Sequence, residues 1–105
     1  KIIEREIGRL ELSLKDAKET AATSMGCYKI YCDGLKYVGR AENGLRKEFD
    51  RLYNGKHKIE ALKKINQNKD KVSVSFVILP TKEKCREIEM KWLNSLKPEW
   101  NNIEK

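Results

Sequence analysis

The sequence predicts a small α+β domain in which a three-stranded, mainly antiparallel sheet is flanked by helices in the order ββααβα, with an extra helix at the N-terminus. Two short runs of strand-forming residues enclose the dipeptide Asp33-Gly34, which is a strong hairpin signal. A third strand-like run comes late in the chain, and the remaining segments carry apolar residues at helical spacing. A hairpin and a separate late strand, covered by helices, are typical of an α+β layout.

Length, charge and cysteine content limit the function classes. The chain has 105 residues and a net charge of +7, from 23 Lys and Arg against 16 Asp and Glu. That length suits one domain, and the longest apolar run, 74–79, is far too short to cross a bilayer, so we expect no membrane partner. Three sparse cysteines form neither a disulfide framework nor a zinc pattern, which favours an intracellular setting, cytoplasm or nucleoid. The positive charge favours nucleic acid over a membrane surface as partner.

Residues 1–24 are interpreted as an N-terminal amphipathic helix and a linker. Apolar residues recur at alternating spacings of four and three from Ile3 to Ala21, which predicts a helix to about residue 22. We favour a helix that packs on the domain, and the alternative is a short coiled-coil contact between two copies of the chain. The residues Leu10, Leu12 and Leu14 also alternate as in a short strand.

The hairpin comes next. The run 27–32 and the run 35–38 are predicted as its two strands, because Gly34 tolerates the positive φ that a tight turn demands. A helix over 44–53 follows, with Asn43 as its N-cap.

The second half of the chain supplies the remaining elements. We predict a helix over 58–67, a strand over 72–79 and a last helix over 82–96 that Thr81 caps. The tail then packs back on the domain through Trp100.

Two tyrosines and a basic stretch mark the candidate site. The hairpin places Tyr28 and Tyr37 on adjacent strands, although tyrosines in such positions also serve ordinary packing. A phenol beside several guanidinium groups is expected to have a lowered pKa and to act as base or nucleophile toward a phosphodiester. A carboxylate such as Glu89 suits one Mg²⁺ or Mn²⁺ held largely through waters. The basic residues that follow the second tyrosine are Arg40, Arg46, Lys47 and Arg51.

The segments around both tyrosines resemble the paired motif of the GIY-YIG endonuclease family, with Cys27 and Val38 in place of the two Ile residues. The segment 89–101 resembles the closing segment of that family, in which a metal-binding Glu precedes a structural Asn. The resemblance covers about residues 26–102 and implies that 25–105 is a nuclease domain with the order ββααβα that cleaves DNA.

The resemblance also implies roles for individual residues. Tyr37 is implied as the general base that activates water, and Tyr28 as the residue that binds or orients the scissile phosphate, or the two roles are exchanged. Arg40 is implied as the positive group near the second tyrosine. Glu89 is implied as the ligand of a single divalent ion, Mg²⁺ or Mn²⁺, and Asn101 as the residue that holds the tail against the site.

One departure from the family concerns an arginine on the helix after the second tyrosine. Counting from Tyr37 gives Lys47, whereas alignment of the apolar spacing gives Glu48. Arg46 is the nearest guanidinium, and a helix start shifted by Gly44 would bring it into the site, so we predict Arg46 as the catalytic arginine. A carboxylate in that place instead would make the domain a catalytically degenerate module that binds nucleic acid.

Further basic side chains are predicted to contact the DNA backbone, since phosphate contacts dominate affinity. Sequence readout is expected from a separate DNA-binding region outside this chain, and the start at Lys1 rather than Met is compatible with a fragment. A last alternative is an interaction module that self-associates through the N-terminal helix, as a homo-oligomer. The residues predicted to bind DNA are Lys47, Arg51, His57 and Lys58.

Overall fold

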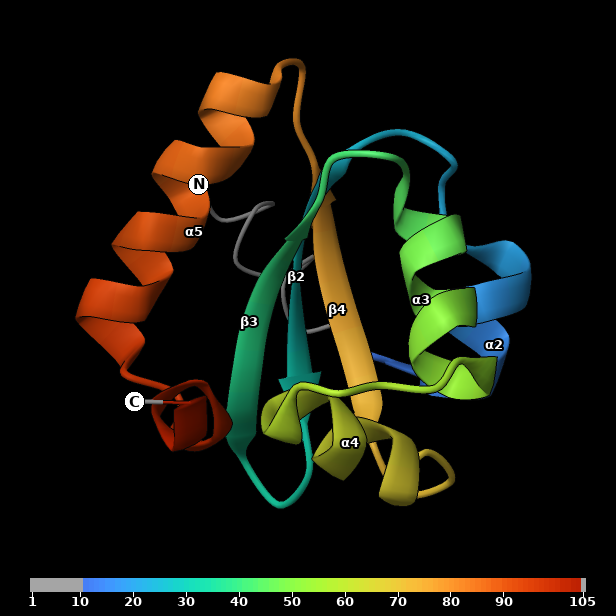
Figure 1. Ribbon diagram of the computed structural model, residues 1–105. Helices are drawn as coiled ribbons and strands as arrows, with labels where there is room; N and C mark the ends of the chain where they lie inside the picture. Colours follow the sequence, from blue (N-terminus) through green and yellow to red (C-terminus); the bar gives the residue numbers. More distant parts are fainter. Residues whose placement is uncertain (1–10, 105) are drawn as a thin grey trace.

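The computed structural model describes residues 11–104 and shows a four-stranded antiparallel sheet with helices on both faces (Figure 1). The strand order is β1-β4-β2-β3, so β3 lies at one edge of the sheet. The elements in chain order are β1 (Leu12–Ser13), α2 (Leu14–Thr20), β2 (Gly26–Tyr31), β3 (Leu35–Ala41), α3 (Leu45–Asn54), α4 (Glu60–Gln67), β4 (Ser73–Ile78), α5 (Lys82–Leu96) and the 3-10 helix η1 (Glu99–Glu104).

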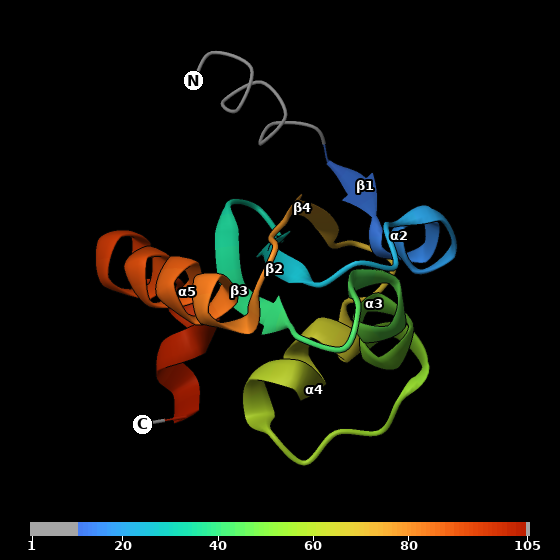
Figure 2. The ribbon, with the colours of Figure 1, turned by 90° about the horizontal axis from the view of Figure 1, so that it is seen from above.

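The two faces of the sheet are covered differently. On one face, α2, α3 and α4 enclose the main core, in which Phe49, Leu52 and Ile65 are fully buried with Ile30 of β2. On the other face, α5 packs on β2 and β3 (Figure 2). The edge strand β3 therefore lies between α3 and α5 and presents side chains to both faces.

The sheet has one strand more than predicted. Leu12 and Ser13 form β1, which pairs with β4 at Val74 and Ser73, so the prediction of three strands is wrong by this short strand. The reason is that one edge of β4 would otherwise have unpaired backbone groups, and Leu12–Ser13 pairs with them. The alternation of leucines at 10, 12 and 14 was the local signal for it.

The predicted N-terminal helix is corrected by the same strand. Residues 1–10 lie outside the described residues, Leu12–Ser13 is a strand, and the helix α2 begins only at Leu14. The Ser13 side chain caps it by accepting a hydrogen bond from the Asp16 N–H at 3.1 Å. Leu14 and Ala17 are fully buried in the same core as β2 and α3. This part of the apolar stripe therefore packs within the domain, and the remainder of the predicted stripe falls on 1–10.

The predicted hairpin is confirmed, although its second strand runs to Ala41, three residues beyond the predicted run 35–38. Asp33 and Gly34 both adopt positive φ, 57° and 101°, as the tight turn requires. The resulting antiparallel register sets Tyr28 opposite Gly39, and it sets Ile30 opposite Tyr37. Both tyrosines consequently project from the α3 face of the sheet, because residues two apart in a strand share a face.

Helix α3 begins one residue later than the predicted cap suggests. Its N-cap is Gly44 (φ 120°), not Asn43, and no side chain caps it. The first N–H groups of α3 instead donate to the loop before β2, Leu45 N to Ser24 O at 2.9 Å and Arg46 N to Ala22 O at 3.0 Å. A Cβ at position 44 would lie 2.8 Å from a backbone oxygen of that loop, so only glycine fits this close approach.

The later elements follow the prediction within two residues at each end. Helix α5 spans the predicted range, and the Thr81 side chain accepts from the Lys84 N–H at 3.0 Å. Lys97 then takes a left-handed conformation and the chain turns into η1. As predicted, Trp100 packs back into the core, with 7% of its surface exposed.

Candidate active site

The hairpin brings the two tyrosines together. The ring centroids of Tyr28 and Tyr37 lie 6.3 Å apart, and the Tyr28 ring also meets Phe49 of α3 edge-on at 5.3 Å. Tyr28 is buried, with its hydroxyl over Gly39, where a Cβ would lie 2.7 Å from the hydroxyl oxygen. The absence of a side chain at Gly39 therefore provides the space that the Tyr28 hydroxyl occupies.

The buried hydroxyl of Tyr28 is bound to a carboxylate. It donates a hydrogen bond to Glu48 Oε2 of α3 at 2.8 Å. Burial raises the pKa of Tyr28 well above its ordinary value, and the Glu48 carboxylate and the neighbouring Tyr37 raise it further, against the opposite effect of Arg51. The expectation of a lowered pKa is therefore wrong for Tyr28, because burial and a carboxylate outweigh the nearby guanidinium.

Glu48 connects this tyrosine to an exposed cation. Arg51, one turn further along α3, donates from Nε to Glu48 Oε1 at 3.2 Å and from Nη2 to Glu48 Oε2 at 3.0 Å. The Glu48 side chain is 15% exposed and the Arg51 side chain 51%. Tyr28, Glu48 and Arg51, called here the α3 cluster, thus run from the buried sheet surface to solvent.

A second group of charges surrounds Arg40 near the end of β3. Arg40 Nη1 lies 2.6 Å from Glu89 Oε1 of α5, and Arg40 Nε lies 2.7 Å from Glu42 Oε2. Arg86 of α5 adds a contact of 3.2 Å from its Nε to Glu42 Oε2. Arg40, Glu42 and Glu89 are called here the α5 cluster.

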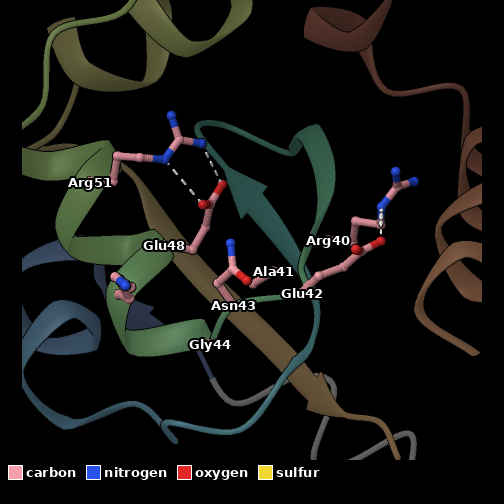
Figure 3. Close-up of a pocket in the computed structure, with 8 residues that line it drawn as sticks. Arg40, Ala41, Glu42, Asn43, Gly44, Glu48 and Arg51 are labelled. Atoms are coloured by element: carbon pink, nitrogen blue, oxygen red, sulfur yellow. Dashed lines mark hydrogen bonds and ion pairs between the residues drawn. The ribbon is translucent and has the colours of Figure 1, made fainter. Parts of the chain in front are cut away.

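Both clusters border one open pocket of about 360 Å³ between the end of β3 and the start of α3. Figure 3 shows Glu48 and Arg51 on one side of this pocket and Arg40 with Glu42 on the other, with Asn43 between them. Three cations and two carboxylates line the pocket, a mixture that suits an anionic group and a cation at once. The lining residues are Arg40, Ala41, Glu42, Asn43, Gly44, Lys47, Glu48 and Arg51.

The described residues include two neighbouring carboxylates in the α5 cluster, Glu42 and Glu89. No group of three or more His, Cys, Asp or Glu side chains within 11–104 could hold a metal ion. Mg²⁺ commonly needs only one or two carboxylates and keeps several waters. Glu89 and Glu42 share one cation, the Arg40 guanidinium.

The predicted catalytic arginine lies elsewhere. Arg46 Nε donates to Ala21 O, at the end of α2, at 2.7 Å, and its side chain lines a different pocket together with Lys18. Residues 46 and 48 are about 200° apart around a helix, so when Glu48 faces Tyr28, Arg46 faces α2. The shift of the helix start at Gly44 does not bring Arg46 to the tyrosines.

The other predicted residues are distributed around the pocket. Lys47 lines it, whereas the exposed Lys58 lies in the segment between α3 and α4. His57 Nε2 lies 3.1 Å from Arg51 O at the end of α3. Of the four residues predicted to bind DNA, Lys47 and Arg51 therefore line the pocket, and His57 and Lys58 follow α3 in the chain.

Asn101 binds the outer edge of β3. Its side-chain oxygen accepts from the Val38 N–H at 2.9 Å, and its side-chain nitrogen donates to Val38 O at 3.0 Å. One carboxamide thereby satisfies both backbone groups of a residue between Tyr37 and Gly39. Asn101 ties η1 to the strand that carries the second tyrosine.

Glu42 is a site residue that the sequence analysis missed. It lies in the turn that follows β3, so strand alternation could not place it beside Arg40. The partner of Glu48 was missed as well, although Glu48 and Arg51 have the i, i+3 spacing of helical ion pairs.

None of the helices within the described part of the chain is long and apolar enough to cross a membrane.

Comparison of the sequence with protein-family models and with curated proteins finds no match. The structure is similar to a crystal structure of the GIY-YIG N-terminal endonuclease domain of UvrC from Thermotoga maritima bound to magnesium, its catalytic divalent cation. The identity is 16% and the TM-score 0.68, over 83% of this chain and 93% of that chain. A point mutant of the same domain, also with its divalent cation, gives 16% identity and a TM-score of 0.67, over 83% and 92%. The chain therefore has the fold of the GIY-YIG endonuclease domain, as the motifs around its two tyrosines implied.

Proposed function

We propose that this domain is a metal-dependent endonuclease that hydrolyses DNA phosphodiester bonds. The observation that carries the proposal is the pocket that Glu48 and Arg51 line together with Arg40 and Glu42, with the Tyr28 hydroxyl bound to Glu48. Guanidinium groups suit a phosphodiester, and the adjacent carboxylates suit a divalent cation. The similarity to an endonuclease domain supports this chemistry over other uses of an ionic pocket.

Tyr37 is the proposed general base. The Tyr28 side chain is only 1% exposed, whereas Tyr37 is half-buried on the edge strand. In the proposed step, a water oxygen forms a bond to phosphorus, one proton of that water passes to Tyr37 Oη in its phenolate form, and the bond from phosphorus to the leaving oxygen breaks. The leaving oxygen then takes up a proton from solvent. Arg40 lies on the same strand and holds Glu89.

Glu89 and Glu42 are the proposed holders of Mg²⁺ or Mn²⁺. When bound, such an ion stabilises the negative charge that develops on the leaving oxygen. Arg40 balances the two carboxylates and keeps them close together. Asn101 keeps β3, and with it Tyr37, in register against η1.

The basic residues beside the pocket are the proposed DNA contacts. Lys47 and Arg51 line the pocket, and His57 and Lys58 continue the path beyond α3. Such contacts recognise the phosphate backbone and not the base sequence. We therefore assign target choice to a separate DNA-binding region.

The decisive experiment is nicking of supercoiled plasmid with Mg²⁺ or Mn²⁺. The wild-type chain is expected to nick, and Glu89→Ala is expected to abolish nicking. The matched control is Glu87→Ala on the same helix, because Glu87 is exposed and its ion pair within residues 11–104 is with Lys84. Nicking that survives Glu89→Ala unchanged would overturn the proposed metal site.

A second candidate function is a degenerate module that binds nucleic acid without cutting it. The observation in its favour is Glu48, a carboxylate within the pocket and in contact with Tyr28. Retention of DNA that falls steeply with salt, without nicking in either metal, would support this candidate.

The third candidate function is self-association through the N-terminal stripe, and part of that stripe is not available as a surface. Leu14 of the predicted stripe is fully buried within the domain. Leu14→Asp would disturb the core even of a monomer, so it cannot test a dimer contact. The test is therefore the molar mass of Leu10→Asp in solution, compared with that of the wild type.

A further inference from the structure

We infer that Arg51 is the guanidinium that contacts the scissile phosphate and that Glu48 is the positioning residue that holds Arg51 in place. This rests on the proposed function and specifies which cation of the pocket faces the reacting group. Three observations on the described residues support it: the exposure of Arg51, the way Glu48 holds it, and the contacts of the competing cations.

Arg51 combines exposure with a defined orientation. About half of its side chain is exposed at the pocket, yet two of its nitrogens are bound to the two oxygens of one carboxylate. A guanidinium carries five N–H donors, so the two used by Glu48 leave others for a phosphate oxygen. A side chain ordered beforehand loses less entropy when the phosphate binds.

Glu48 is itself anchored to the core. The Tyr28 hydroxyl donates to Glu48 Oε2, and Tyr28 is packed between Gly39 and Phe49. The α3 cluster is therefore a continuous series of hydrogen bonds from the sheet to the exposed guanidinium. A carboxylate in this position orients a cation, and its negative charge is offset by the bidentate pair with Arg51.

The other cations near the pocket are less suited to this role. Arg40 also uses two nitrogens, but it binds two carboxylates, Glu42 and Glu89, which are the proposed metal holders, whereas Arg51 binds one. Arg46 is bound to a backbone oxygen on the side of α2. Lys47 lines the pocket, but an ammonium is a point charge on a flexible stem and cannot make a bidentate contact.

The first test compares arginine and lysine variants in the nicking assay. Arg51→Ala is expected to lower kcat about 100-fold, the effect of removing one donor from a developing negative charge. Arg51→Lys is expected to recover only a small part of that loss, and Lys47→Ala to lower activity much less than Arg51→Ala. Lys15→Ala on α2 is the control that leaves activity unchanged. Equal losses for Arg51→Ala and Lys47→Ala would overturn the inference.

The second test asks whether Glu48 acts through Arg51. Glu48→Ala is expected to lower kcat about 10-fold in the wild type and to have no effect in the Arg51→Ala background, because coupled residues are not additive. An equal loss in both backgrounds would overturn the positioning role, as would a gain of activity in the wild type. Glu48→Gln keeps one oxygen for Arg51, so its kcat is expected to lie between those of the wild type and Glu48→Ala. This variant replaces Glu48→Ala in the test if Glu48→Ala fails to fold.

A third readout separates this inference from the proposed nuclease activity. Affinity for a short duplex oligonucleotide, measured without divalent metal, needs no cleavage. Arg51→Ala is expected to weaken binding several-fold more than Lys47→Ala, and Glu48→Ala to weaken it in the wild type alone. If the wild type binds but does not nick, the nuclease proposal fails and these affinities still decide the inference. Equal weakening by Arg51→Ala and Lys47→Ala would overturn it.

Discussion

The two clusters of the pocket hold their ions in different ways. In the α3 cluster, Glu48 and Arg51 are one turn apart on a single helix, and the pair is anchored to a buried tyrosine. In the α5 cluster, Arg40 comes from β3 and Glu89 from α5, so their contact exists only because α5 packs on the sheet. The first pair is therefore expected to persist as long as α3 does, whereas the second depends on the packing of two separate elements.

The largest expected effect comes from removing the cation shared by the α5 cluster. Arg40→Ala leaves Glu42 and Glu89 without the guanidinium that both contact. The two carboxylates then repel each other, and we expect plasmid nicking at saturating Mg²⁺ to fall about 100-fold. Lys36→Ala is the matched control, since Lys36 lies on the same face of β3 and pairs with Glu99 of η1. Comparable activity in both variants would contradict a role for the α5 cluster.

The next effect concerns β3, the strand that carries Tyr37 and Arg40. Asn101→Ala removes two hydrogen bonds to the backbone of Val38, a residue buried in β3. We expect a loss of about 2 kcal/mol in the free energy of unfolding, measured with urea, because backbone groups at a partly buried edge lose their partners. Asn94→Ala, at an exposed position of α5, is expected to change stability little. Equal stability of both variants would show that η1 does not support β3.

The contribution of Tyr28 in the α3 cluster to stability is expected to depend on pH in the alkaline range. The pKa of Tyr28 is raised in the folded state by burial first and by Glu48 next, whereas an unfolded tyrosine ionises at about 10. The unfolded chain therefore loses a proton that the folded chain keeps, so this contribution to stability is complete below about pH 10 and falls as pH rises further. Tyr28→Phe is expected to reduce that fall.

The same variant series gives a spectroscopic check. Ultraviolet titration of the phenolate should show one tyrosine that resists ionisation, and Glu48→Gln should lower its pKa because a negative neighbour is removed. A titration curve that Glu48→Gln leaves unchanged would contradict the contact between Tyr28 and Glu48.

The smallest expected effect concerns the reactivity of Cys27, on the face of the sheet toward α5. Burial raises the pKa of the Cys27 thiol to about 12, with further contributions from Cys85 and Glu89. Because the thiolate is the reactive form, Cys27 should react with a thiol reagent far more slowly than the half-buried Cys32 in the native protein. Cys32→Ser is expected to remove the fast phase, with little change in stability or nicking. A fast phase that persists in Cys32→Ser would show that the α5 face opens readily.

Much of the fold was predictable from local patterns. The Asp33-Gly34 turn defines the hairpin, and the hairpin register alone sets Tyr28 opposite Gly39. Thr81 marks the start of α5 by a side-chain cap that depends only on nearby residues. Two features were not predicted because they depend on partners distant in the sequence. Leu12–Ser13 forms a strand at the edge of β4, and the loop before β2, not Asn43, accepts the hydrogen bonds of the first N–H groups of α3.

The candidate site likewise has features set by neighbouring residues and features set by tertiary packing. The sequence by itself determined the hairpin, the two tyrosines on one face, and the i, i+3 pair of Glu48 and Arg51, because strand alternation and helical periodicity are properties of neighbouring residues. Only the tertiary structure decided that Arg46 turns to α2, that Glu89 meets Arg40 across 49 positions of chain, and that burial raises the pKa of Tyr28. Ion pairs between elements and the loss of water around a side chain depend on how helices pack on a sheet, and no local pattern encodes that packing.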